Sequence, residues 1–294
     1  MDAVQRYVSN ELSHFVGQDK TDEEQYDLLV NKILKSGWLT HGPYHDPNVP
    51  RSANLDFSKP ISKDEAIAYQ VVCFCDIPEV DLGIHTDKYG KFGLAFTKKF
   101  LIEAGACPVF YVTNESPVNP PGFVCPQEFE VDRVQEAKKN MRIDRALYFD
   151  TSVRVILDIF AAFDALCCNE NDRFFKGGAL SVSECKNRLG ALFCLNETQV
   201  TSAELALKNN TQANATLRIC MDFLINYVFT FIKCFNAKSG FQDELNYYME
   251  REWRVAGNVH FGLDDVSRVF FPRKYAKRFR SDIPEYAGQV SFIN

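Results

Sequence analysis

Residues 71–112 place side chains that can do chemistry between apolar runs, in the sequence VVCFCDIPEVDLGIHTDKYGKFGLAFTKKFLIEAGACPVFYV. His85 and Tyr89 are four residues apart, so a helical turn would present an imidazole and a phenol on the same side. Asp76 directly follows the first apolar run. Because binding sites are commonly built at the ends of strands, we expect Asp76, His85 and Tyr89 to face a ligand. A structural hydrogen-bonded pair of His85 and Tyr89 is the alternative.

The sequence EREWRVAG near the C-terminus offers a carboxylate and a guanidinium on one strand. Side chains alternate between the faces of a strand, so Glu252 and Arg254 share one face and Trp253 lies on the other. A neighbouring arginine keeps a glutamate ionised, which suits a carboxylate that polarises a hydroxyl or stabilises a cationic transition state. Glu250 lies on the same face and competes for this role. An exposed ion pair on an edge strand is the structural alternative.

Several histidines and cysteines raise the question of a metal site: His41, His45, Cys73, Cys75, Cys107 and the pair Cys167–Cys168. None has zinc-site spacing, because one residue separates the first two cysteines and the two histidines lie in a proline-containing segment. We therefore predict no metal site. A Cys75 nucleophile paired with His85 is an alternative, but no thiol-protease sequence surrounds it and a packed, buried cysteine is the simpler interpretation.

A basic segment, PRKYAKRFR, follows the apolar run VSRVFF. Its cations are Arg273, Lys274, Lys277, Arg278 and Arg280. Tyr275 and Phe279 are interleaved with them, a mixture that can contact phosphates and stack on bases. A solvated basic helix face is the simpler interpretation of the segment, and contact with nucleic acid or a partner is the alternative.

The composition predicts a globular protein rather than one whose whole surface binds nucleic acid. Hydrophobic residues make up 46% of the 294 residues, and the formal net charge is -6. We find no signal-peptide pattern, so we expect a cytoplasmic protein whose ten cysteines are reduced. The most apolar stretch, residues 217–235, contains Arg218, Asp222, Asn226 and Lys233, so we expect a buried amphipathic helix and no membrane partner.

These residues must be positioned by strands near both ends of the sequence. Strand patterns occur at residues 7–17 and in the apolar runs on either side of His85, and they return after residue 240. The middle has helical periodicity and almost no strand signal. We therefore expect an α+β fold with three parts: residues 1–130 as the N-terminal part, residues 131–241 as a helical insertion, and residues 242–294 as C-terminal strands and a basic helix that complete the sheet.

The sequences LSHFVG, ILKSGWL, the block at residues 71–112 and EREWRVAG, in this order, resemble the bacterial abortive-infection phage-resistance family AbiGi. That family is described as the antitoxin half of a two-gene system. The resemblance is specific in the block and in EREWR, and it leaves residues 131–241 uncovered. It implies a role in phage defence and a co-encoded toxin or antitoxin as partner.

A His in the strand SHFV, the helix ILKSGW and a late strand with a glutamate are more distantly similar to the DNA-targeting ADP-ribosyltransferases called DarT. This similarity implies a split, mixed or antiparallel sheet that holds NAD. His14 would bind the ribose, Tyr89 would stack on nicotinamide and Glu252 would be the catalytic carboxylate. Arg51 would contact a phosphate. The expected cofactor-binding residues are His14, Arg51, Asp76, His85, Tyr89 and Arg254, and His14, Tyr89 and Glu252 are the catalytic ones.

Three functions therefore stand side by side. The first is NAD-dependent ADP-ribosyl transfer to nucleic acid or protein during phage defence. The second is an antitoxin of the same fold that binds its toxin without turnover. The third, a nucleic-acid-binding regulator, depends on the basic segment alone. Residue types that can catalyse a reaction do not by themselves show that a site is assembled, so the geometry must decide.

Overall fold

The computed structural model describes residues 9–40, 54–55, 67–68, 70–113, 156–157, 159–165, 181–193, 195–209, 211–235, 240 and 247–293. The chain forms two compact units. The first comprises residues 1–50, 70–110 and 238–294, and the second comprises residues 51–69 and 111–237. Arg51, His41, His45 and the pair Cys167–Cys168, all named as candidates above, lie outside the described residues.

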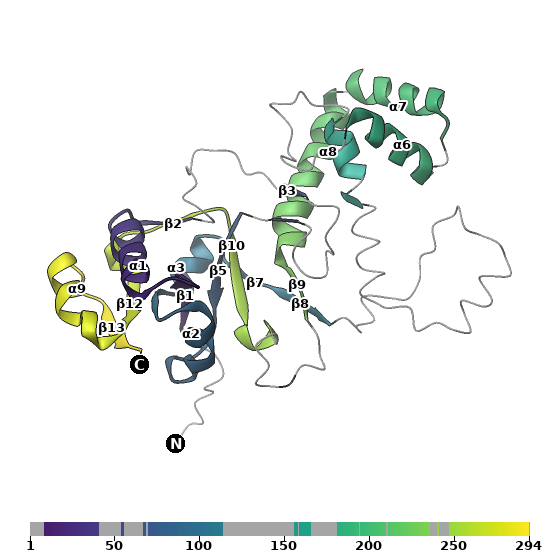
Figure 1. The fold of residues 1–294 in the computed structure, drawn as a ribbon. Coiled ribbons are helices and arrows are strands. Elements are labelled where there is room, and N and C mark those ends of the chain that lie inside the picture. Colours follow the sequence, from purple (N-terminus) through teal and green to yellow (C-terminus); the bar gives the residue numbers. More distant parts are fainter. Residues whose placement is uncertain are drawn as a thin grey trace. The chain divides into compact units, whose positions relative to one another are not determined.

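The first unit contains a seven-stranded sheet in the order β13-β12-β6-β1-β5-β10-β7. Its strands are β1 (Glu11–Val16), β5 (Val71–Cys75), β6 (Phe92–Thr97), β7 (Cys107–Pro108), β10 (Glu252–Ala256), β12 (Val266–Phe271) and β13 (Gln289–Phe292). Neighbouring strands are antiparallel except β12 and β13, which are parallel. The predicted α+β class is confirmed, and strands from both ends of the sequence join in one mixed sheet, with β10 inserted between β5 and β7 (Figure 1).

One face of this sheet carries the main hydrophobic core. β1, β6 and β12 contribute Leu12, Leu94, Phe96 and Val269, all fully buried. The helix α1 (Asp22–Asp27) packs on this core together with the π-helical turn η1 (Leu28–Leu34), the helix α3 (Lys98–Glu103) and the helix α9 (Ala276–Asp282). Figure 1 shows α1 and α9, from opposite ends of the sequence, side by side. This face therefore joins the two terminal segments through hydrocarbon.

The start of α1 is encoded locally. The side chain of Thr21 accepts a hydrogen bond from the Glu24 amide, and the Glu24 carboxylate accepts one from the Thr21 amide in return. This capping box satisfies amides that the first helical turn leaves without partners. Tyr26, Leu29 and Ile33 then follow at helical spacing and are buried, as the sequence pattern predicts.

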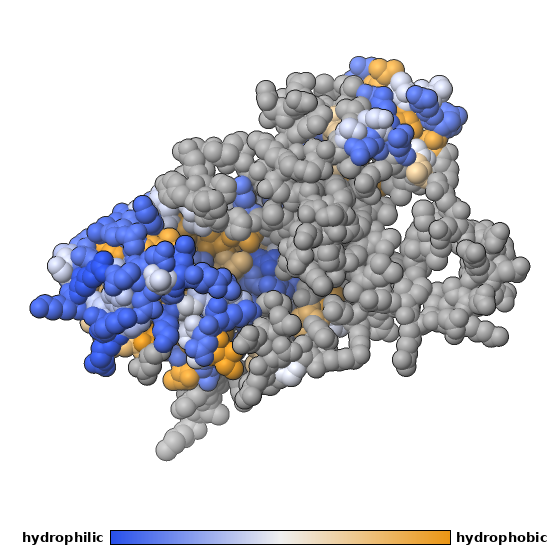
Figure 2. Space-filling view, in the orientation of Figure 1, coloured by the Kyte–Doolittle hydropathy of each residue, from blue (hydrophilic) through white to orange (hydrophobic). Residues whose placement is uncertain are grey.

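The opposite face of the sheet is covered by a smaller element, the helix α2 (Gly83–Tyr89), which follows the short 3-10 turn η3 (Glu79–Asp81). Leu82, between them, packs with Phe15, Cys75, Ala95 and Phe270. Figure 2 shows that the visible side of the described first unit is mostly hydrophilic. The hydrophobic cluster beneath α2 contains far fewer buried residues than the core on the other face.

Gly93 is required by the packing of this second face. It is paired with Phe15 on one side and with Phe270 on the other, and the two phenyl rings lie 5.3 Å apart. A Cβ at Gly93 would lie 2.6 Å from the His14 carbonyl oxygen and 2.8 Å from the Phe15 ring. The absence of a side chain therefore lets two aromatic rings from flanking strands meet.

The remaining short elements of the first unit are η8 (Tyr247–Glu250), η9 (Leu263–Asp265), η10 (Arg273–Tyr275) and the two-stranded sheet of β2 (Trp38–Leu39) and β11 (Val259–His260). Through this pair, the segment that follows η1 lies beside the segment that follows β10. The ring of Trp38 contacts the ring of His260 there, with centroids 4.5 Å apart. This pairing adds a second link between N-terminal and C-terminal segments.

The described part of the second unit is mainly helical. It contains α6 (Val182–Phe193), α7 (Glu197–Asn209) and α8 (Thr211–Phe223), which continues into η6 (Leu224–Val228) and η7 (Phe229–Phe231). Its strands are β3 (Asn54–Leu55) paired with β4 (Ile67–Ala68), and β8 (Phe110–Thr113) paired with β9 (Ile232–Phe235). The unit takes in residues 51–69 and 111–130 in addition to residues 131–237 of the segment predicted as a helical insertion, whose last residues, 238–241, belong to the first unit.

The expectation of one helix through residue 235 is wrong at its end. The backbone becomes extended at Ile232 and continues as β9, because the apolar and β-branched sequence FIKC fits a strand as well as a helix. None of the helices in the described ranges is long and apolar enough to cross a membrane.

Candidate functional site

The face of the sheet beneath α2 holds a buried ion pair. Cys75 of β5 is paired with Glu252 of β10, and Cys73 is paired with Arg254, so all four side chains project from the same face. The Arg254 Nε atom donates to a Glu252 oxygen at 2.6 Å, and both residues are about as buried as the surrounding core. The prediction that Glu252 and Arg254 share a face is confirmed, but they lie on an inner strand rather than on an exposed edge.

The second carboxylate, Glu250, is bound by α2. The Tyr89 hydroxyl donates to a Glu250 oxygen at 2.6 Å, and the Lys88 ammonium lies 2.8 Å from the same oxygen. Arg251, between the two glutamates, has a φ of 43°, in the left-handed region that non-glycine residues rarely adopt. This turn ends η8 just before β10 begins, so the two carboxylates have separate sets of partners.

His85 and Tyr89 lie together on α2, as their spacing predicts, with ring centroids 4.5 Å apart. The His85 ring also meets the edge of the Phe15 ring at 5.4 Å. Burial lowers the pKa of His85 to about 4, and the positive charge of Lys88 lowers it further. The imidazole is therefore neutral near pH 7 and packs as a largely apolar ring beside Tyr89.

Cys75 lies under the same helix and is not activated as a nucleophile. Burial, together with the negative charge of Glu250, raises the pKa of the Cys75 thiol to about 12. A thiol with such a pKa remains protonated, whereas nucleophilic attack requires the thiolate. The structure thus supports the interpretation of Cys75 as a packed cysteine. Among the described residues there is no group of three or more potential ligands that could hold a metal ion.

His14 does not share a face with Glu252, and the expectation that they border one cleft is corrected by the strand register. Ser13 is paired with Cys75, which is paired with Glu252, so Ser13 and Glu252 project to the α2 side. The next residue, His14, projects to the other side, where its ring contacts Phe74 at 5.7 Å between centroids.

The His14 ring has a structural partner in the neighbouring strand. Its Nδ1 lies 2.7 Å from the Cys73 carbonyl oxygen, which can only accept, so Nδ1 is the donor. β1 and β5 are paired at one position, Ser13 with Cys75. The imidazole hydrogen-bonds to the Cys73 carbonyl, which lies beyond that position. Burial lowers the pKa of His14, partly opposed by this hydrogen bond, so the ring is a neutral donor near pH 7.

Asp76 also lies apart from His85 and Tyr89, contrary to the expectation that the three face one ligand. Its carboxylate accepts a hydrogen bond from the Ser9 amide at 2.9 Å and from the Lys98 ammonium at 2.7 Å. Asp76 follows Cys75, whose side chain points toward α2, so strand alternation directs Asp76 to the opposite side. It therefore fastens the segment before β1 to the start of α3.

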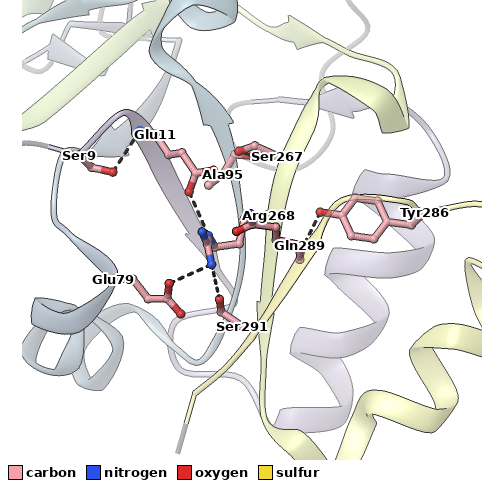
Figure 3. Close-up of polar contacts among 9 residues, drawn as sticks. All are labelled: Ser9, Glu11, Glu79, Ala95, Ser267, Arg268, Tyr286, Gln289 and Ser291. Carbon is pink, nitrogen blue, oxygen red and sulfur yellow. Dashed lines mark hydrogen bonds and ion pairs between the residues drawn. The ribbon is translucent and has the colours of Figure 1, made fainter.

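Arg268 on β12 is a centre of polar contacts that the sequence analysis does not identify. Its guanidinium contacts Glu11 of β1 at 3.0 Å, Glu79 of η3 at 2.8 Å and the Ser291 hydroxyl of β13 at 2.7 Å (Figure 3). Arg268 is paired with Ala95, and Ala95 with Ser13, so this network lies on the α2 side of the sheet. The only signal in the sequence is a cation inside the apolar run VSRVFF.

The basic segment at residues 273–280 is tied to its own unit. Lys274 pairs with Asp22 at 2.6 Å and Arg278 pairs with Glu23 at 2.6 Å, both at the start of α1. Arg280 donates to the Tyr286 carbonyl and Arg273 lies over the Phe292 ring, while Lys277 is exposed. Two of the five cations, Lys274 and Arg278, are thus paired with carboxylates of the same unit.

The two aromatic residues of that segment are not available to stack on bases. Tyr275 is buried and stacks on Tyr26 with ring centroids 5.0 Å apart, and Phe279 is fully buried against Phe271. The expectation of interleaved aromatic and basic groups on one surface is therefore wrong. Helical periodicity accounts for this, because Tyr275 and Phe279 are four residues apart and both face the core.

The α2 side of the sheet thus brings together His85, Tyr89, Lys88 and Glu250 as one group and Glu252 with Arg254 as another. Lys88 binds the carboxylate of Glu250, which precedes Arg251 in the sequence, and Arg254 binds the carboxylate of Glu252, which follows it. Such an arrangement fixes ionised groups in place with low reorganisation. His14, however, lies on the opposite side of the sheet, and Tyr89 binds Glu250 rather than Glu252, so the three predicted catalytic residues are not assembled around one carboxylate.

A model of the protein family described as "Putative abortive phage resistance protein AbiGi, antitoxin" matches residues 50–282. The match includes residues 131–241, so the expectation that this part lies outside the resemblance is wrong. No curated protein and no solved structure gives a significant match. The ADP-ribosyltransferase-like arrangement of the sheet therefore has no structural neighbour that supports it.

Proposed function

Because the chain belongs to the AbiGi family, we propose that it is the antitoxin of a two-gene phage-defence system and acts by binding a co-encoded toxin. The observation that carries this proposal is the family match over residues 50–282, which extends across segments of both compact units. A binding function requires a stable surface rather than an assembled reaction centre.

The contacts of the ionisable groups support binding over turnover. Glu252 is held by Arg254, Glu250 by Tyr89 and Lys88, and Asp76 by Lys98 and the Ser9 amide. The imidazole that the DarT resemblance assigns to the ribose lies on the face opposite Glu252. Carboxylates held in this way stabilise a fold without needing a substrate.

The test is co-expression of this chain with the protein encoded by the neighbouring gene. We expect the two proteins to co-elute in size-exclusion chromatography, and we expect co-expression to restore growth where the neighbour alone is toxic. Failure of both, with this chain folded by circular dichroism, would overturn the antitoxin proposal. A matched control is an unrelated acidic protein of similar size, which should neither co-elute nor restore growth.

An NAD-dependent ADP-ribosyl transfer is the second candidate. The observation that favours it is the short ladder between β1 and β5, which has one registered pair, with the His14 imidazole bonded to the Cys73 carbonyl next to that pair. A ligand that binds only the folded state raises the melting temperature at saturating concentration. A shift with NAD that disappears in both Glu252→Gln and His14→Ala would show NAD binding through these residues and favour this candidate, and no shift with NAD would remove it.

A further inference from the structure

The outer side of η3 and α2 presents apolar side chains to solvent. Val80 is 90% exposed and Ile84 is 55% exposed, and Val80 is the most exposed large hydrophobic residue in the described part of the chain. Residues 80, 84 and 87 are separated by four and three positions, so they follow one side of the helical turns. Two exposed carboxylates accompany these apolar side chains: Asp81 lies between Val80 and Ile84 in the sequence, and Asp87 follows Ile84.

This outer side is held in place by the inner side of the same turns. Leu82 and Thr86 are buried against the sheet, and the Thr86 hydroxyl donates to the Gly83 carbonyl at 2.9 Å. Glu79, next to Val80, is bound to Arg268 of β12 at 2.8 Å (Figure 3). Val80 is therefore presented by an anchored turn, and its exposure is part of the folded structure.

Gly83 lies between Val80 and Asp87 on this side, three residues after the first and four before the second. It has an ordinary φ, and a Cβ built on it would meet no atom within 4 Å. Neither backbone conformation nor packing against the described residues requires glycine at this first position of α2. A partner whose backbone approaches the helix closely would explain the residue.

We infer that Val80, Asp81, Gly83, Ile84 and Asp87, here called the α2 strip, form the docking surface for a basic segment of the toxin. Asp81 and Asp87 form no ion pair with any described residue, so their charge is available to a cation of the partner. Val80 and Ile84 provide the apolar contact, and Gly83 allows close approach. The identity of the occupant rests on the antitoxin function proposed above.

The test measures the dissociation constant between this chain and the purified protein encoded by the neighbouring gene. Ile84→Ser removes an apolar contact, Asp87→Lys reverses a charge and Gly83→Gln places a neutral side chain where the partner is expected to approach closely. Each is expected to weaken binding by at least about tenfold. Ile102→Ser and Asp264→Lys are matched controls at exposed positions outside the α2 strip, since Ile102 is also 55% exposed, and they should change binding by less than about twofold.

The outcomes separate the two proposals. Binding by the wild-type chain with no loss in the three α2 strip variants would overturn the docking surface and leave the antitoxin function standing. No binding by the wild-type chain would overturn both. Hydrogen exchange adds a readout without substitutions, because the amides of residues 79–87 should become protected in the complex while those of α3 stay unchanged. Unchanged melting temperatures of the variants would show that weaker binding is not caused by unfolding.

Discussion

The two faces of the seven-stranded sheet are built from different materials. One face is closed by large hydrocarbon side chains such as Leu94 and Phe96, which α1, η1 and α9 cover. The other face has a smaller apolar cluster under α2 and, next to it, two carboxylates with cationic partners. The comparison teaches that burial alone does not identify a hydrophobic core, because Glu252 and Arg254 are as buried as many of the apolar residues.

The difference predicts different responses to substitution. On the hydrocarbon face, the cost of a substitution comes from lost transfer free energy and from the cavity left behind. On the α2 face, the cost comes from separating charges that cannot easily recover water.

Arg254→Met should destabilise the protein by roughly 3–5 kcal/mol, because it leaves the Glu252 carboxylate buried without its guanidinium. Urea unfolding followed by tryptophan fluorescence measures the change. The double variant Glu252→Gln/Arg254→Met should lose less than the single variant, since the buried charge is then also removed. A double variant at least as unstable as Arg254→Met would contradict the assignment. On the hydrocarbon face, by contrast, the double variant Leu94→Ala/Phe96→Ala should be less stable than Leu94→Ala, because each truncation removes buried hydrocarbon.

Acid should destabilise the α2 face through His85. Its pKa is about 4 in the folded protein and near 6.5 when the imidazole is exposed on unfolding. Between these values the unfolded state binds more protons, so stability falls as the pH drops, by up to about 3 kcal/mol. In His85→Phe the stability lost between about pH 7 and about pH 4.5 should be smaller than in the wild type. Equal losses in the two proteins would contradict this role of His85.

Tyr89→Phe should cost about 1.5 kcal/mol, since it removes the hydrogen bond to the Glu250 carboxylate but leaves Lys88 as a partner. Urea unfolding at neutral pH is again the measurement. The matched control is Tyr248→Phe at an exposed tyrosine, which should be nearly neutral. A Tyr89 variant indistinguishable from that control would mean that Lys88 alone holds the carboxylate.

Arg251→Gly should have the smallest effect and the opposite sign. The φ of 43° strains an arginine but not a glycine, so we expect a gain of about 0.5–1 kcal/mol after the greater freedom of glycine in the unfolded chain is included. Thermal unfolding measures it. A loss of stability would show that the Arg251 side chain makes a compensating contribution.

Much of the element order follows from local sequence. The runs VVCFC and FGLAFT become β5 and β6, and EWRVA becomes β10. The segment with His85 and Tyr89 forms the short helix α2, so these two side chains lie on the same side of it. The union of N-terminal and C-terminal strands in one sheet is also predicted correctly. These features depend on periodicity, propensity and turn residues that are encoded within a few positions.

Which side chains share a face of the sheet could not be predicted, because this depends on the pairing register of strands that are far apart in the sequence. Both sides of β1 are buried, so the sequence ELSHFV lacks the alternation that would tell the direction of His14. That direction is fixed by the pairing of Ser13 with Cys75. A shift by one residue would exchange every side chain between the faces. The network around Arg268 is hidden for the same reason, since its partners lie on three other segments.

The interleaved strand order has a consequence for synthesis on the ribosome. β10 must pair beside β5, and β12 beside β6, but both come from the segment after residue 250. Until that segment emerges, the nascent chain exposes two apolar strand edges that have no permanent neighbour. Such late, long-range closure slows folding and favours aggregation. We therefore expect nascent chains that end before residue 250 to be held by chaperones.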